Sequence, residues 1–310
     1  MPVTQRRDTV SKTCDCTGIM GAIVNALGFD PADSVVIGGI KDQTLSACMR
    51  LDSDIPTNEV VEPLLDMVLG NGLEYLLVVG FGGGAGRTLD TDLTGMVAMV
   101  LPIVYMATVT DGVFTVNIGC REHSDHPAPM PEADLPSRDE MLAQFESGST
   151  QHPPVHLATP EQRRFAEDAA MDAVRTGPGS DGWAGFPQVE AMFTVAQNVH
   201  ARDPFVRRLT DEGQVEAAAH LVLAAIQHYE PSAMLYALAA LLFWMTGQGA
   251  QAINCAERAQ KLGDPHASLA DLVDQAVRVG LPPSTWAQVS LDIPMGVLRG
   301  GLQDVAEQNA

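Results

Sequence analysis

No other stretch of this chain concentrates metal-binding and proton-transferring side chains as the loop Cys120–Pro127 does. Within it, Cys120, His123 and His126 form the pattern Cys-x2-His-x2-His, and Asp125 stands between the histidines. Thiolate and imidazole are the usual ligands of zinc, and short spacings let one loop supply two or three of them. A closed structural zinc site needs four ligands, and no second ligand pair of the usual form follows. The residues alone therefore leave two interpretations, a zinc site and an ordinary solvated loop.

The glycine-rich stretch Gly80–Gly86 is a second candidate, because it follows a predicted strand and precedes a predicted helix. It can be fitted to the dinucleotide fingerprint G-x-G-x-x-A, which makes Gly80, Gly82 and Gly84 candidate cofactor-binding residues. The fit is weak, since a run of five glycines matches many patterns by chance and the lysine of a P-loop is absent. The alternative is a flexible loop at the carboxyl end of a sheet. Open α/β sheets bind ligands at that end, so the loop could still form the mouth of a pocket.

The elements that must position these loops are alternating helices and strands. Apolar residues between Thr17 and Gly28 indicate a helix that the glycine ends, and a further helix is expected over 88–99. Asp111-Gly112 separates two β-branched runs and predicts a hairpin, because both turn positions favour positive φ. Together these patterns predict an α/β domain with a mixed sheet of about five strands. The expected strands are Ser34–Ile40, Thr44–Leu51, Leu73–Val79, Ile103–Thr110 and Val113–Ile118.

The C-terminal part of the chain repeats a set of small and turn-forming residues at a spacing of 34 residues. This spacing is typical of the tetratricopeptide helix–turn–helix unit, and it predicts an all-α domain of about two such hairpins. The tryptophan and tyrosine positions of the usual pattern are mostly leucine or alanine here, so an ordinary helical bundle is the alternative. The repeated residues are Gly213-Gln214 with Gly247-Gln248, Ala218 with Ala252, Ala225 with Ala259, and Pro231 with Pro265.

Changes in composition along the chain indicate four segments. Residues 1–150 are expected to form the α/β domain, and residues 151–187 a helix followed by a linker rich in glycine and proline. Residues 188–300 are expected to form the helical repeat-like domain, and residues 301–310 a frayed tail. The helix in the second segment begins at Thr159–Gln162, which fits a capping box with proline at the first helical position.

The overall charge limits the classes of partner. The 310 residues carry a formal charge of −21, which argues against nonspecific binding of nucleic acid and against anionic membrane surfaces, because both require a basic face. Two explanations remain for the acidity, a surface that favours solubility and a surface for a basic partner. The chain is long enough, and at 46% apolar enough, to bury a sizeable core. No oligomeric state is assigned.

The cysteines and the apolar segments favour the cytoplasm. Five cysteines form an odd, scattered set rather than a disulfide framework, which favours a reducing compartment. No apolar run follows Arg6-Arg7 closely enough for a signal peptide. The most apolar stretches, 96–109 and 233–245, are too short to span a bilayer. We therefore expect a cytoplasmic protein without a membrane partner.

Several motifs along the chain match those of a known family. The most specific is Leu27–Val36, a leucine-glycine-phenylalanine turn followed by proline, acid and serine before a strand. Other matching stretches are Arg50-Leu51-Asp52, Leu76–Gly82, Leu135–Arg138, the segment 232–265 and Leu281–Trp286. Over most of its length the chain thus resembles the uncharacterised actinobacterial family called domain of unknown function (DUF) family 4192. The resemblance implies an α/β half and a helical half, and it implies no activity.

The resemblance also bears on the polar loop. Family members often carry, after an aromatic strand, a cysteine, a four-residue spacer, two adjacent cysteines and a proline. Here Cys120 is kept, while Asp125 and His126 stand at the paired-cysteine positions. All three are metal-ligand types, so the resemblance supports a metal site at this loop, with His123 as the spare ligand, and disfavours thiol redox chemistry, which needs two sulfurs. A loop that has lost its site is the alternative.

Two functions remain open from the sequence. In the first, a binding or adaptor protein presents its helical repeats to a protein or peptide, and its α/β domain holds a small ligand or a metal. In the second, a zinc-dependent hydrolase holds the metal with Cys120, His123 and His126, and Asp125 or Glu122 acts as the base. The first is favoured because the chain contains no complete catalytic motif, and no catalytic residues are assigned.

Overall fold

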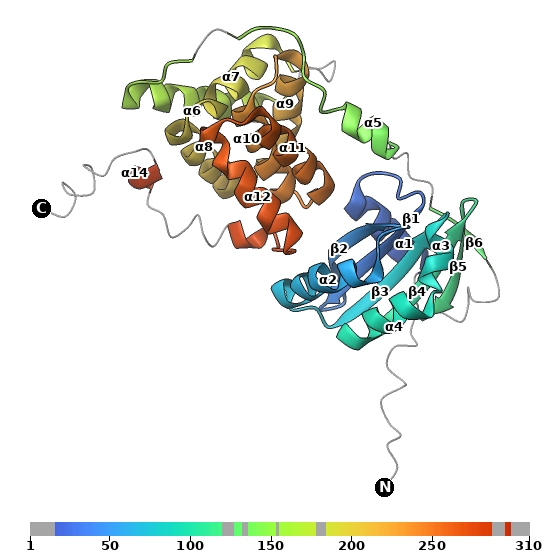
Figure 1. Ribbon diagram of the computed structural model, residues 1–310. Coiled ribbons are helices and arrows are strands. Elements are labelled where there is room, and N and C mark those ends of the chain that lie inside the picture. The colour runs from blue at the N-terminus through green and yellow to red at the C-terminus, as the bar shows by residue number, and fades with distance from the viewer. Residues whose placement is uncertain are drawn as a thin grey trace, which may run out of the picture. The chain divides into compact units, whose positions relative to one another are not determined.

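The chain forms two compact units, one ending at Arg138 and the other beginning at Asp139 (Figure 1). The first unit is α/β and the second is helical, which confirms the fold class predicted from the sequence. None of the described helices is both long enough and apolar enough to cross a membrane. The computed structural model describes residues 16–119, 127–131, 136–152, 155–177, 184–286 and 295–298.

A mixed sheet of six strands forms the centre of the α/β unit. Its strands lie in the order β2-β1-β3-β4-β5-β6, in which β3 and β4 run parallel and the other neighbours run antiparallel. The sixth strand has only two residues, so the sequence pattern that predicted about five strands gave no sign of it. The strands are β1 Ser34–Lys41, β2 Thr44–Asp52, β3 Tyr75–Phe81, β4 Ile103–Thr110, β5 Val113–Ile118 and β6 Ala128–Pro129.

Helices cover this sheet. The helices α2 (Thr57–Asn71) and α4 (Thr91–Val100) share one apolar core with β1 and β3, and α1 (Cys16–Leu27) packs against β2. The short helix α3 (Gly84–Thr88) contacts β3, β4 and β1. The sequence predicted a helix over 88–99, whereas α4 begins at Thr91, because the Asp90 carboxylate accepts a hydrogen bond from the Asp92 amide at 3.0 Å and caps the helix there.

Two predicted chain reversals have the backbone conformation that their residues favour. Gly28 ends α1 with a φ of 74°, the left-handed conformation that glycine adopts without steric cost. Asp111 and Gly112 join β4 to β5 with φ values of 52° and 72°, as expected for a two-residue hairpin turn. The hairpin prediction is therefore confirmed, and it brings Asp111 to the end of β4.

The helical unit packs around α10, which is buried on every side from Ala233 to Trp244. Helices α7, α9, α11 and α12 all contact α10. Because α10 has no solvated face, it lacks the polar stripe of an amphipathic surface helix. The helices of this part of the chain are α5 Arg138–Ala143, α6 Pro160–Thr176, α7 Phe186–Ala196, α8 Val199–Glu212, α9 Val215–His228, α10 Ala233–Met245, α11 Gly249–Leu262, the 3₁₀ turn η1 Pro265–Ala267, α12 Ser268–Arg278 and α14 Met295–Leu298.

The 34-residue spacing recurs in the helices themselves. Helix α8 begins at Val199 and α10 at Ala233, while α9 begins at Val215 and α11 at Gly249. The repeated alanines of α9 and α11 are all buried, as close packing of neighbouring helices requires. Whether these hairpins belong to the tetratricopeptide class stays a prediction.

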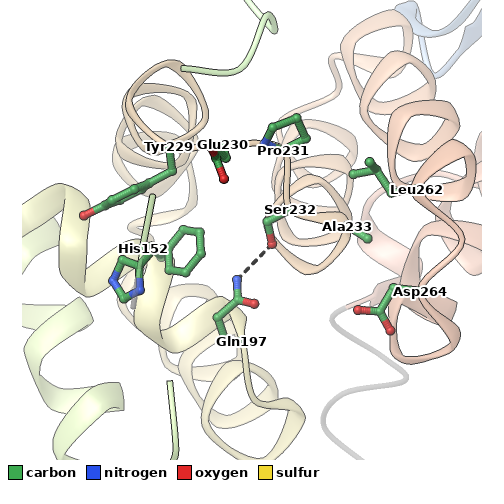
Figure 2. Close-up of a pocket in the computed structure, with 10 residues that line it drawn as sticks. His152, Gln197, Tyr229, Glu230, Pro231, Ser232, Ala233, Leu262 and Asp264 are labelled. Carbon is green, nitrogen blue, oxygen red and sulfur yellow. Dashed lines mark hydrogen bonds between the residues drawn. The ribbon is translucent and has the colours of Figure 1, made fainter. Parts of the chain in front are cut away.

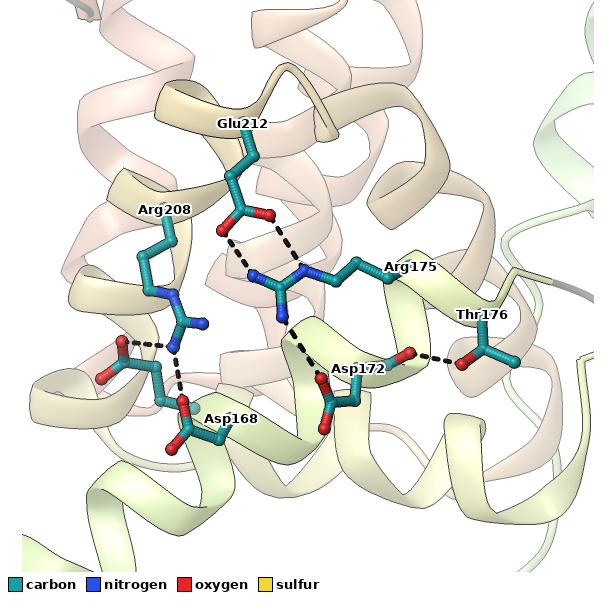
Figure 3. A network of polar contacts seen from close by, with 7 residues as sticks. Asp168, Asp172, Arg175, Thr176, Arg208 and Glu212 are labelled. Carbon is teal, nitrogen blue, oxygen red and sulfur yellow. Dashed lines mark hydrogen bonds and ion pairs between the residues drawn. The ribbon is translucent and has the colours of Figure 1, made fainter.

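Ion pairs join α6 to α8 (Figure 3). One Arg208 nitrogen lies 3.0 Å from the carboxylate of Glu167 and 2.6 Å from that of Asp168. Arg175 donates two hydrogen bonds to Glu212, of 2.6 and 3.0 Å. These hydrogen bonds lower the pKa of the Glu212 carboxyl. The two carboxylates bound to Arg208 differ in burial: the Glu167 side chain is 1% exposed and the Asp168 side chain is 55% exposed.

This difference yields a prediction for the stability of the helical unit. Glu167→Ala is expected to lower its free energy of unfolding by about 3 kcal/mol, because it removes a buried partner of Arg208. Asp168→Ala, which removes an exposed partner of the same arginine, is expected to cost about 0.5 kcal/mol. Urea unfolding followed by tryptophan fluorescence measures both, since all three tryptophans come after Asp139 in the sequence. Equal effects of the two substitutions would contradict the assignment.

Candidate functional site

The predicted zinc ligands Cys120, His123, Asp125 and His126 lie outside the residues that the structure describes. Within the described ranges, no three His, Cys, Asp or Glu side chains are placed to share a metal ion. The zinc site and the hydrolase built on it therefore stay predictions.

Both ends of the polar loop are attached to the outer strands of the sheet. Before the loop, Gly119 has a φ of 108° and lies against the Val104 carbonyl, where a Cβ atom would overlap the oxygen. After the loop, Ala128 of β6 pairs with Phe114 of β5. Gly119 follows the last residue of β5 and Phe114 is near its start, so the chain enters and leaves the loop near opposite ends of this strand.

The glycine-rich stretch lies at the carboxyl end of β3, and two of its candidate residues are required by packing. A Cβ atom at Gly80 would overlap the Thr88 hydroxyl, and a Cβ atom at Gly84 would overlap the Ser34 carbonyl. Only glycine permits backbone segments to approach this closely. Close contact between α3 and the strand ends therefore accounts for both residues without any ligand.

The third candidate glycine belongs to a turn that the neighbouring aspartate holds. Gly82 has a φ of 52°, and its amide donates to the Val109 carbonyl at 2.8 Å. The next amide, of Gly83, donates to the Asp33 carboxylate at 2.7 Å. The Asp33 carboxylate thus accepts the hydrogen bond of a backbone amide that could otherwise donate to a bound phosphate.

A cavity of about 330 Å³ opens beside this turn, at the carboxyl ends of the parallel strands β3 and β4. Among the candidate glycines, Gly82 lines it. Every polar side chain in its lining is an aspartate, namely Asp30, Asp33 or Asp111. Apolar side chains form the remaining wall, and they are Val24, Pro31, Ala32, Phe81, Val109, Met130 and Pro131.

Strand pairing explains why these three aspartates meet. The antiparallel pair Val35–Gly80 brings the turn before β1, with Asp30 and Asp33, to the end of β3. Since β4 is parallel to β3, the hairpin at Asp111 lies at the same end of the strands as the end of β3.

Asp111 was predicted as a hairpin-turn residue, and the site that it shares with Asp33 was missed. The available signal was their position next to strands β1 and β4, but using it required the strand order. Both residues have a positive φ of 52°, a conformation that aspartate tolerates better than most side chains.

The packing of the glycine turn gives a second prediction. Gly84→Ala is expected to destabilise the α/β unit by about 2 kcal/mol, because the new methyl group would overlap the Ser34 carbonyl. Gly86→Ala is the matched control, since it lies in the same helix and nothing occupies the space around its Cβ. It should leave stability unchanged or raise it by about 0.5 kcal/mol.

Hydrogen exchange of peptides from β3 and β4 measures the two variants within the full chain. Faster exchange is expected for Gly84→Ala alone. Equal protection from exchange in both variants would show that Gly84 of α3 does not pack tightly against the Ser34 carbonyl.

Comparisons with known proteins add no relative from which a function could be transferred. No family model, curated protein or solved structure matches the chain. The resemblance to DUF family 4192 therefore stays a prediction, and the role of the cavity is inferred from its geometry and chemistry.

Proposed function

We propose that this is a binding protein whose α/β unit takes a small organic cation, such as an amine with an apolar body. The observation that carries the proposal is the lining of the cavity at the ends of β3 and β4. Its polar side chains are all carboxylates, and the rest of its wall is apolar. A cationic group would gain from the carboxylates, and an apolar body would gain from leaving water against Phe81, Val109 and Met130.

Other ligand classes fit this cavity less well. A single metal ion would need several carboxylates around one point, and the described acidic side chains are not placed in that way. A nucleotide would bring phosphates toward Asp30 and Asp111, while Asp33 already holds the Gly83 amide. Like charges at close range are unfavourable, so the dinucleotide prediction for Gly80, Gly82 and Gly84 has little support from the geometry.

In this proposal the helical unit supplies the contacts with a protein or peptide, as expected of an adaptor. Its helical hairpins recur every 34 residues, as in α8 and α10, which begin at Val199 and Ala233. Such stacked hairpins expose extended surfaces that suit binding of a chain.

We propose the cytoplasm as the compartment. Among the described cysteines, Cys48 and Cys255 form no disulfide. Burial raises the pKa of the Cys48 thiol to about 12 and also raises that of Cys255, so both are kept as neutral thiols. Unpaired cysteines are typical of a reducing compartment.

A ligand panel with a charge variant tests the amine site. Isothermal titration of the full chain would compare phenethylamine with phenethyl alcohol and phenylacetate, which keep the aromatic body and change the charge. Binding of the amine is expected to be the tightest. Asp111→Asn should weaken it about five-fold, because it removes one carboxylate while asparagine keeps the positive-φ turn.

Asp42→Asn is the matched control for this variant. Asp42 also stands in a two-residue hairpin turn with a φ of 50°. It follows β1, however, and so lies at the opposite end of the strands from the cavity. Its substitution should leave amine binding unchanged. Binding of phenylacetate as tight as that of the amine, or equal losses in both variants, would refute the proposal.

A further inference from the structure

A second cavity, of about 400 Å³, lies within the helical unit (Figure 2). The end of α7, the turn between α9 and α10, and the end of α11 surround it. Figure 2 shows Tyr229, His152 and Gln197 on one side and Leu262 and Asp264 on the other. Its lining also contains Phe193, Glu230, Pro231, Ser232 and Ala233.

An extended segment before α6 builds one wall of this cavity. Thr150 donates from its amide to the His228 carbonyl at 3.2 Å and accepts from the Glu230 amide at 3.0 Å. This pairing places His152 in the cavity wall, where its ring stacks on Phe193 at 4.0 Å between centroids. The wall is therefore held by backbone hydrogen bonds and ring stacking, and it does not need a ligand to form.

Hydrogen bonds of Ser232 hold the turn between α9 and α10 in place. Ser232 caps α10 by accepting a hydrogen bond from the Leu235 amide at 3.3 Å. Its hydroxyl oxygen also accepts from the Gln197 side chain at 3.0 Å (Figure 2). This contact ties the end of α7 to the start of α10, so the side chains at the opening, Glu230 and Pro231, project from a fixed backbone.

The charges of the lining have one sign. It contains the carboxylates of Glu230 and Asp264, both on exposed residues, and none of the lining residues is lysine or arginine. Beside them lie the apolar side chains of Pro231, Ala233 and Leu262, and Leu262 is 45% exposed. The cavity therefore combines apolar surface with two carboxylates.

We propose that this cavity receives a lysine or arginine side chain of a peptide or protein partner. Such a side chain has an apolar stem, which would lie along Leu262 and Pro231, and a cationic head, which would reach Glu230 and Asp264. The charge of −21 over the whole chain favours approach of a basic partner to this cavity. The proposal names the partner chemistry of the helical unit and is independent of the amine site in the α/β unit.

Capped pentapeptides of sequence Gly-Ala-X-Ala-Gly test the proposal with the full chain at constant ionic strength. Saturation-transfer NMR titration would compare lysine or arginine at X with norleucine, which keeps an aliphatic stem without the charge, and with glutamate. The basic peptides are expected to bind about ten-fold more tightly than the norleucine peptide. No binding of basic peptides by the wild-type chain, or equal binding of the norleucine peptide, would overturn the proposal.

The double substitution Glu230→Gln with Asp264→Asn is expected to weaken the basic peptides about ten-fold. The control Glu216→Gln with Glu62→Gln removes the same two charges from exposed positions outside the cavity and should change nothing. An equal loss in the control would show that only the overall charge attracts the peptides, which would overturn a specific site. Far-ultraviolet circular dichroism verifies that each variant is folded.

Leu262→Lys provides an independent check, because the new ammonium group can reach the carboxylates and compete with the peptide. It should abolish the preference for basic peptides, and unchanged binding would overturn the placement of the stem. Asp111→Asn should bind these peptides like the wild-type chain. Loss at this variant alone would assign the basic peptides to the α/β cavity and refute the helical site.

Discussion

The backbone at the end of β3 lies so close to its neighbours that no side chain fits there, and the candidate site depends on this contact. Gly80 lies against Thr88, and Gly84 lies against the Ser34 carbonyl, so α3 packs directly on the strand ends. This approach brings the Gly83 amide within 2.7 Å of the Asp33 carboxylate. The carboxylate satisfies the amide, and the amide holds the carboxylate at the rim of the cavity. A bulkier residue at either packed glycine would separate the two groups and change the shape of the site.

The distribution of charge gives both cavities an acidic character. The chain has 18 lysines and arginines against 39 aspartates and glutamates. Several arginines of the helical unit bind carboxylates on other segments, as Arg175 does with Glu212 and Arg258 with Glu146. These cations therefore serve to join elements of the unit, while the carboxylates that line the two cavities face no lysine or arginine among the lining residues. The acidic composition therefore becomes a local negative charge at the two cavities, because these arginines are engaged in ion pairs elsewhere.

Local signals predicted most of the elements, because they depend on residues that are neighbours in sequence. The β-branched runs on both sides of Asp111-Gly112 gave two strands whose bounds agree with β4 and β5. The capping box at Thr159 is present, with the Gln162 amide donating to the threonine hydroxyl at 3.2 Å. Helix α3 was missed because most of its residues lie in the glycine-rich stretch, which shows no helical pattern. Strand β6 was missed because two residues show no periodicity.

The sequence by itself determined the fold class, the turns and the acidity, because residue type decides which backbone conformations and charges are available. It also left the glycine turn as one candidate for the mouth of a pocket, with a flexible loop as the alternative. Only the tertiary structure decided which carboxylates stand there, since Asp30, Asp33 and Asp111 come from separate turns that the register of β1, β3 and β4 brings together. In the same way, His152 meets Phe193 and Tyr229 only because the extended segment before α6 pairs with the turn after α9. Register and packing arise from contacts between distant segments, and such contacts leave no local pattern in the sequence.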